Sequence, residues 1–104
     1  MIGRGHVWWG NFDKLRPGVI VSSDRVCDLD FWQVHLVPIS TSGWHADFPY
    51  SAPIRFPGTG DPCFATTLDL RLLARHQLID YVGELDVHGM TAVDATLRSS
   101  FALD

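Results

Sequence analysis

The chain has 104 residues, 46% of them hydrophobic and 19% charged, and its formal net charge is −4. This length suits one domain, which we expect to span residues 1–104 around a single modest core. The net negative charge argues against a protein that binds nucleic acid over its whole surface, but it allows a local basic site. No window is long and apolar enough to span a membrane, and the N-terminus lacks the apolar region of a signal peptide, so we expect a cytoplasmic protein with no membrane partner.

Proline and glycine occur throughout the chain, a pattern that favours short strands over long helices. Expected strands lie at residues 5–9, 18–22, 31–39, 52–56, 63–70 and 80–85. One helical turn is expected after a cap at residues 23–24, and another near 74–77. The C-terminus is helical, because Met90, Val93, Leu97 and Phe101 recur at helical spacing and Asp86 can cap the start. The pattern predicts a mainly β fold, a small and strongly bent antiparallel barrel with short helices and a C-terminal α-helix.

The cysteines and histidines give no sign of a metal site. Cys27 and Cys63 stand far apart and outside any CxxC pattern, so we expect two buried thiols rather than a disulfide. The five histidines are scattered and fall in no recognisable motif. The sequence therefore predicts neither a metal nor a cofactor.

An arginine and a proline stand at the start of the apolar run at residues 18–22. Pro17 fixes its own φ, lacks an N–H donor and keeps Arg16 out of the helical region. We therefore expect Arg16 in extended backbone at the edge of the strand, with its guanidinium available to a carboxylate or a phosphate. The alternative is a surface ion pair with Asp13 or Asp24.

Four short motifs follow one another along the chain. They are RGHVW at residues 4–8, RPGVIVS at 16–22, VPIS at 37–40 and VGEL at 82–85. Each motif alone is weak, but in this order and at this spacing they resemble the MazF/PemK toxins of bacterial type II toxin–antitoxin systems along nearly the whole chain.

The resemblance implies an SH3-like barrel that forms a homodimer and acts as a metal-independent endoribonuclease, an mRNA interferase that cleaves single-stranded RNA at short sequences. In such toxins the 2′-hydroxyl is the nucleophile, and cleavage leaves a 2′,3′-cyclic phosphate and a 5′-hydroxyl. The implied partners are RNA and a cognate antitoxin, which silences the toxin with a disordered, acidic C-terminal segment.

The resemblance also assigns catalytic residues. Arg16 matches the family's catalytic arginine, and a permanently charged guanidinium suits the negative charge that builds on the phosphoryl oxygens. The family's usual threonine falls on Ser40, with Thr41 beside it. Whether Ser40, Thr41 or a loop histidine assists Arg16 stays open, and a simple Ser/Thr turn that ends the strand is the alternative.

RNA contacts are expected from aromatic and basic side chains, because unpaired bases stack on aromatic rings. Phe12 and Trp44 are expected in loops and are the candidates for stacking, whereas Trp9 is expected in the core. The remaining candidates for RNA contact are Lys14, His45 and Arg71. The loop at residues 10–15 is shorter than in many relatives, so no recognition sequence can be carried over.

Two other functions remain open. One is a non-catalytic poison that resembles the CcdB gyrase inhibitors and binds a protein target, although this chain lacks their Trp-Gly-Ile ending. The other is an SH3-like interaction module, since fold does not fix function. The acidic composition slightly favours these two hypotheses, whereas the Arg16-Pro17 and Ser40-Thr41 pairs favour the nuclease.

Overall fold

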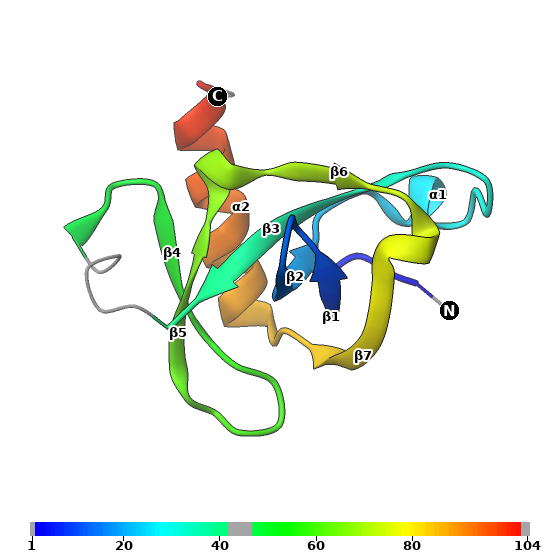
Figure 1. Ribbon diagram of the computed structural model, residues 1–104. Helices are drawn as coiled ribbons and strands as arrows, with labels where there is room; N and C mark the ends of the chain where they lie inside the picture. The colour runs from blue at the N-terminus through cyan, green and yellow to red at the C-terminus, as the bar shows by residue number, and fades with distance from the viewer. Residues whose placement is uncertain (1, 42–46, 103–104) are drawn as a thin grey trace.

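The computed structural model describes residues 2–41 and 47–102. Seven strands lie within these residues: β1 (His6–Asn11), β2 (Leu15–Ile20), β3 (Val34–Ser40), β4 (Ser51–Arg55), β5 (Pro62–Thr66), β6 (Arg71–Leu73) and β7 (Leu78–Glu84). The α-helices are α1 (Asp24–Cys27) and α2 (Val87–Phe101), and two 3₁₀ turns are η2 (Thr67–Asp69) and η3 (Arg75–Gln77). Figure 1 shows the strands wrapped around one side of α2. None of the described helices is long and apolar enough to cross a membrane.

The strands form one antiparallel sheet in the order β4-β5-β3-β2-β1-β7, and β6 pairs with β3 outside this path. β3 bends the sheet, because its first five residues pair with β6 and β2 while its last two residues pair with β5. β4 and β7 do not pair with each other, so the sheet is strongly bent without closing. The predicted mainly β, barrel-like fold with a C-terminal helix is confirmed.

Several predicted boundaries were wrong. β2 begins at Leu15 rather than at residue 18, which places Arg16 and Pro17 inside the strand. β3 begins at Val34 rather than at residue 31, because the guanidinium of Arg75 donates hydrogen bonds to the carbonyls of Leu29 and Trp32 in the preceding loop, and to one carbonyl of α1, and so holds the loop out of the sheet. The three residues of β6 were not predicted as a separate strand, since so short a segment shows no alternation of its own.

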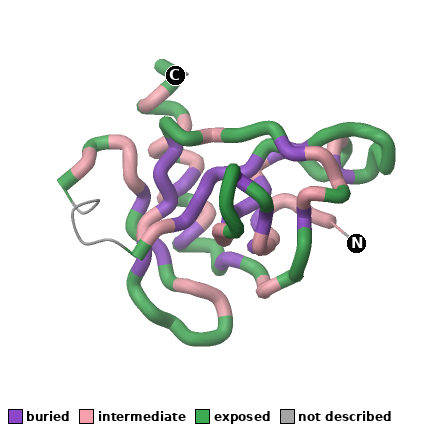
Figure 2. The backbone as a smooth tube through the Cα atoms, viewed as in Figure 1, coloured by how far each residue is buried: buried purple, intermediate pink, exposed green. Residues whose placement is uncertain are grey.

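The central strands are buried on both faces (Figure 2). Val19 and Val37 pack into a cluster that includes Val93 of α2, whereas their neighbours Ile20 and Leu36 point into a second cluster on the opposite face. Successive side chains of a strand point to opposite faces, which is why residues 18–20 of β2 and 36–39 of β3 form uninterrupted apolar runs.

Both cysteines are buried free thiols, as predicted. Cys27 belongs to the second cluster and Cys63 to the cluster under α2. Burial in each case raises the thiol pKa, because the charged thiolate is poorly solvated there.

The C-terminal helix is held at its start and in its middle. The side chain of Asp86 caps it by accepting a hydrogen bond from the backbone N–H of Gly89 at 2.7 Å, as predicted. In the middle of α2, both terminal nitrogens of Arg4 donate to the carboxylate of Asp94. The Nε of Arg4 donates to the carbonyl of Val21 at 3.2 Å. Arg4 therefore joins the helix to the chain that leaves β2.

Replacing Arg4 by alanine removes this link, and we expect Arg4→Ala to lower the free energy of unfolding by about 1–3 kcal/mol, because it removes a charged pair and leaves the Val21 carbonyl without its donor. Urea denaturation followed by circular dichroism measures the loss. Arg25→Ala is the matched control, since Arg25 is exposed on α1 and should change stability by less than about 0.5 kcal/mol. Equal stability of the two variants would contradict a structural role for Arg4.

Candidate functional site

The β1–β2 hairpin carries the arginine that the sequence singles out. Asn11 pairs with Leu15 at the end of the hairpin, and a three-residue loop between them contains Asp13 with a φ of 81°. Aspartate tolerates this left-handed conformation better than most residues. The tight loop places Arg16 in register with Gly10, so the arginine has extended backbone, as expected.

The guanidinium of Arg16 lies over an aromatic ring. Its Cζ atom is 6.0 Å from the ring centroid of Phe12, within the range of a cation–π interaction. The ring itself fills the space above Gly18, where a Cβ atom would lie only 2.6 Å from Cζ of Phe12. Glycine at position 18 thus makes room for the ring that supports Arg16.

The two predicted ion-pair partners of Arg16 bind elsewhere. Asp13 pairs with Arg71 at 3.2 Å, and the carboxylate of Asp24 accepts a hydrogen bond from the backbone N–H of Arg4 at 3.0 Å. Within residues 2–41 and 47–102, Arg16 has no carboxylate partner. The alternative of a surface ion pair with Asp13 or Asp24 is therefore wrong.

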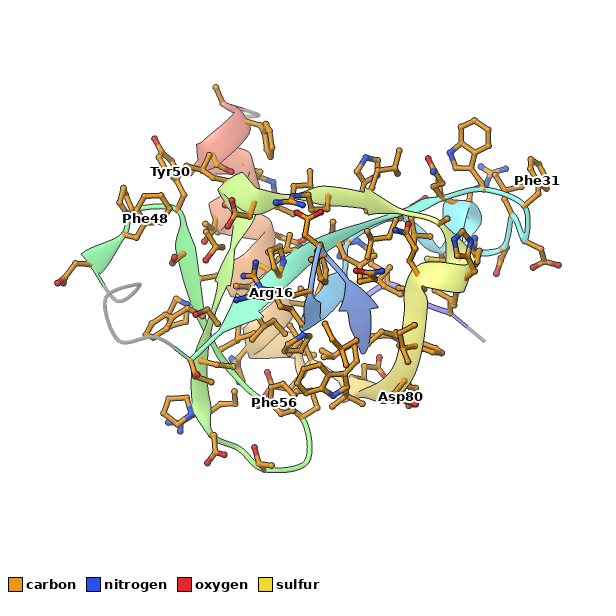
Figure 3. The ribbon with its side chains drawn as sticks, viewed as in Figure 1. Arg16, Phe31, Phe48, Tyr50, Phe56 and Asp80 are labelled. Carbon is orange, nitrogen blue, oxygen red and sulfur yellow. The ribbon has the colours of Figure 1, made fainter. Side chains whose placement is uncertain are left out.

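Two clefts meet at Arg16. The first, here called the Phe56 cleft, has a volume of about 570 Å³, and the second, the Phe48 cleft, has about 460 Å³. Four residues line both clefts: Lys14, Arg16, Ile39 and Ser40. In Figure 3 the Arg16 side chain lies between those of Phe48 and Phe56. The arginine therefore faces a groove that continues on both sides of it.

The hydroxyl residues at the end of β3 lie beside the arginine. Ser40 is the last residue of β3, pairs with Phe64 of β5 and lines both clefts, whereas Thr41 is exposed and lines only the Phe56 cleft. The fold thus brings together residues 16 and 40–41, which lie on different strands. A cation that is always charged and two hydroxyl groups can together hold a phosphate.

A comparison with protein families shows where the chain belongs. Residues 3–101 match the family model described as PemK-like, MazF-like toxin of type II toxin–antitoxin systems. The chain belongs to this family. The resemblance drawn from the four sequence motifs is confirmed.

Solved structures show the same fold at low sequence identity. An endoribonuclease in complex with its cognate antitoxin, from a mycobacterial species, superposes with a TM-score of 0.86 at 20% identity and covers 100% of this chain and 98% of its own. The Mycobacterium tuberculosis toxin MazF-mt6 superposes with a TM-score of 0.82 at 20% identity, and the match covers 95% of this chain and 98% of the toxin. A MazE–MazF structure from Deinococcus radiodurans superposes with a TM-score of 0.77 at 16% identity, and the match covers 99% of this chain and 97% of the matched chain. No curated protein sequence matches the chain.

The structure separates the residues predicted to contact RNA. Lys14 lines both clefts, whereas Phe12 is only 3% exposed, so the prediction that its ring stacks on a base does not fit its burial. Arg71 is exposed and held by Asp13, and it lines neither cleft. Trp44 and His45 lie outside the described residues.

Other residues of the groove were missed. Trp9 was expected in the core, yet it is half-buried and lines the Phe56 cleft. The reason lies in β1, whose pairing with β7 shifts register on both sides of residues 8–9, so that strict alternation along the strand fails. The missed residues also include Phe56, Thr59 and Asp61 in the Phe56 cleft, and Phe48, Thr66 and Leu68 in the Phe48 cleft.

The described part of the site was also compared with the requirements of a metal centre. Among the described residues, no group of three or more His, Cys, Asp or Glu side chains could hold a metal ion. The arrangement around Arg16 thus offers a cation, hydroxyl groups and apolar walls.

The contact between Phe12 and position 18 leads to a stability prediction. A methyl group at position 18 must displace the buried ring, so we expect Gly18→Ala to cost about 1–3 kcal/mol of stability. The double variant Phe12→Leu/Gly18→Ala should lose less stability than the sum of its two single variants, because leucine lacks the atom that the methyl group meets. Denaturant melts of the four proteins measure the coupling. Strictly additive losses would mean that the two residues do not interact.

Proposed function

We propose that this protein is an endoribonuclease toxin that cleaves single-stranded RNA, mRNA included, at short sequences. The observation that carries the proposal is Arg16, a guanidinium without a carboxylate partner among the described residues, placed where two clefts meet beside Ser40 and Thr41. Membership in the MazF-like toxin family supports it, as does the fold shared with proteins named as endoribonucleases.

The proposed reaction uses a nucleophile that the RNA supplies. The 2′-hydroxyl gives its proton to water as its oxygen attacks the adjacent phosphorus. The bond from phosphorus to the 5′-oxygen breaks, the leaving oxygen takes a proton from water, and the products are a 2′,3′-cyclic phosphate and a 5′-hydroxyl. Negative charge builds on the phosphoryl oxygens during the attack, and the paired N–H donors of Arg16 stabilise it. The reaction needs no metal or other cofactor, because the RNA supplies the nucleophile and Arg16 supplies the positive charge.

The hydroxyl groups have a supporting role in this proposal. Ser40 or Thr41 donates a hydrogen bond to a phosphoryl oxygen or orients the 2′-hydroxyl, and neither is an efficient base unaided. The RNA passes over Arg16 with its flanking nucleotides in the Phe56 and Phe48 clefts. Lys14, which lines both, meets the neighbouring phosphates.

A cognate antitoxin would act on the same groove. The relatives include complexes between such a toxin and its antitoxin. We propose that a disordered, acidic segment of the antitoxin covers Lys14 and Arg16 and so excludes RNA. The protein acts in the cytoplasm, where mRNA is available.

The first test replaces the arginine. We expect Arg16→Ala to lower the rate of RNA cleavage by at least about 100-fold, because single donors to a developing oxyanion are worth about 3 kcal/mol. Purified protein is incubated with a long, sequence-diverse RNA in EDTA, and the fragment ends are mapped and tested for a 2′,3′-cyclic phosphate. Ser40→Ala and Thr41→Ala in the same assay show which hydroxyl assists.

Arg98→Ala is the control, because Arg98 is an exposed arginine on α2 that lines neither cleft. Normal cutting by a folded Arg16→Ala protein would refute the catalytic assignment. Absence of cutting by folded wild-type protein, shown to be free of antitoxin, would favour the CcdB-like poison instead.

The second test concerns assembly. We propose that the protein is a homodimer, and exposed apolar side chains on the sheet, among them Leu72, Ile79 and Tyr81, support this. Light scattering at micromolar concentration should give twice the chain mass of 11.6 kDa. A mass of one chain at that concentration would contradict the dimer.

A further inference from the structure

The walls of the Phe56 cleft carry opposite charges. Its cations, Lys14 and Arg16, come from the β1–β2 hairpin, whereas its carboxylate, Asp61, comes from the turn between β4 and β5. Asp61 is exposed and has no ion-pair partner within the described residues. A ligand that fits this cleft carries a negative charge at one end and hydrogen-bond donors at the other.

Flat apolar groups lie in the same cleft. Trp9 and Phe56 both line it, and each is half-buried, so part of each ring remains accessible. Base–aromatic stacking contributes about 1–3 kcal/mol per base and tolerates any base. The rings can therefore hold a nucleobase without choosing which one.

Hydrogen bonds fix the backbone of Asp61 next to that of Phe56. The backbone N–H of Phe56 donates to the carbonyl of Asp61 at 2.9 Å, and the N–H of Gly60 donates to the carbonyl of Phe56 at 2.9 Å. The N–H of Asp61 donates to the hydroxyl of Thr59 at 3.2 Å. The turn thus carries its own hydrogen bonds, which hold the backbone of Phe56 and that of Asp61 in a fixed relation at the edge of the cleft.

We propose that the Phe56 cleft is a guanine subsite in which Asp61 accepts hydrogen bonds from the base. A carboxylate offers two acceptor oxygens and no donor, so it pairs best with two adjacent N–H groups. Guanine presents such a pair, N1–H and the N2 amino group. In adenine, cytosine and uracil, an acceptor atom stands beside each donor and is repelled by the carboxylate.

This inference rests on the proposed function for its RNA substrate. A guanine nucleotide beside the scissile phosphate places its phosphate at Lys14 and Arg16 and its base edge at Asp61. Asp61 is then a residue that determines specificity, and the sequence cut by the enzyme contains guanine at one fixed position next to the cleaved bond.

Binding of nucleoside 3′-monophosphates tests the subsite without requiring cleavage. NMR titrations of the full chain with the guanosine, inosine, adenosine, cytidine and uridine compounds should show guanosine bound most tightly. Inosine lacks only the N2 amino group, so it should bind at least about tenfold more weakly, as expected for the loss of a hydrogen bond to a charged group. In Asp61→Ala, guanosine and inosine should bind equally.

The matched control is Asp28→Ala, which removes an exposed carboxylate that lines neither cleft and should keep the preference for guanosine over inosine. Equal binding of all five compounds to the wild type, or an unchanged preference in Asp61→Ala, overturns the subsite. Mapped cuts separate this from failure of the proposed reaction. RNA cut without a fixed guanine refutes the subsite alone, whereas selective guanosine binding without any cutting supports the subsite and refutes the nuclease.

Discussion

The packing of one ring against one glycine determines the geometry of the site. Phe12 closes the β1–β2 hairpin, belongs to the second core cluster and occupies the space above Gly18 that any side chain there would need. Because the ring is buried, it gives Arg16 a fixed apolar surface to lie over. A guanidinium supported in this way loses less conformational freedom when it binds a phosphate, which is the advantage of a preorganised charge.

Charge at the site differs from charge over the whole protein. The chain is acidic, with a net charge of −4, so its overall field does not attract RNA. Lys14 and Arg16 nevertheless face the same groove from one short hairpin. Attraction at contact distance suffices to hold a phosphate, because screening by salt weakens distant charges much more than close ones. An acidic composition is therefore compatible with the proposed nuclease.

Local sequence signals identified the elements whose causes are themselves local. The cap at Asp86 and the helical spacing that follows it depend on neighbouring residues, and the predicted helix is present as α2. Pro17 restricts Arg16 by a clash between adjacent residues, and Arg16 is extended as expected. The register shifts of β1 and the pairing of β6 with β3 have no such local cause. The sequence therefore placed Trp9 in the core, and it did not predict β6 as a strand.

The sequence by itself determined the mainly β fold, the terminal helix and, through four motifs in order, the toxin family and Arg16 with Ser40 as candidates. Only the tertiary structure decided which side chains share the groove. Phe12 looked like a loop aromatic and is buried, whereas Asp61, unremarkable in sequence, faces Arg16's cleft from a distant hairpin. The physical reason is that a cleft forms between strands that are remote in sequence, and their approach depends on the packing of the whole sheet.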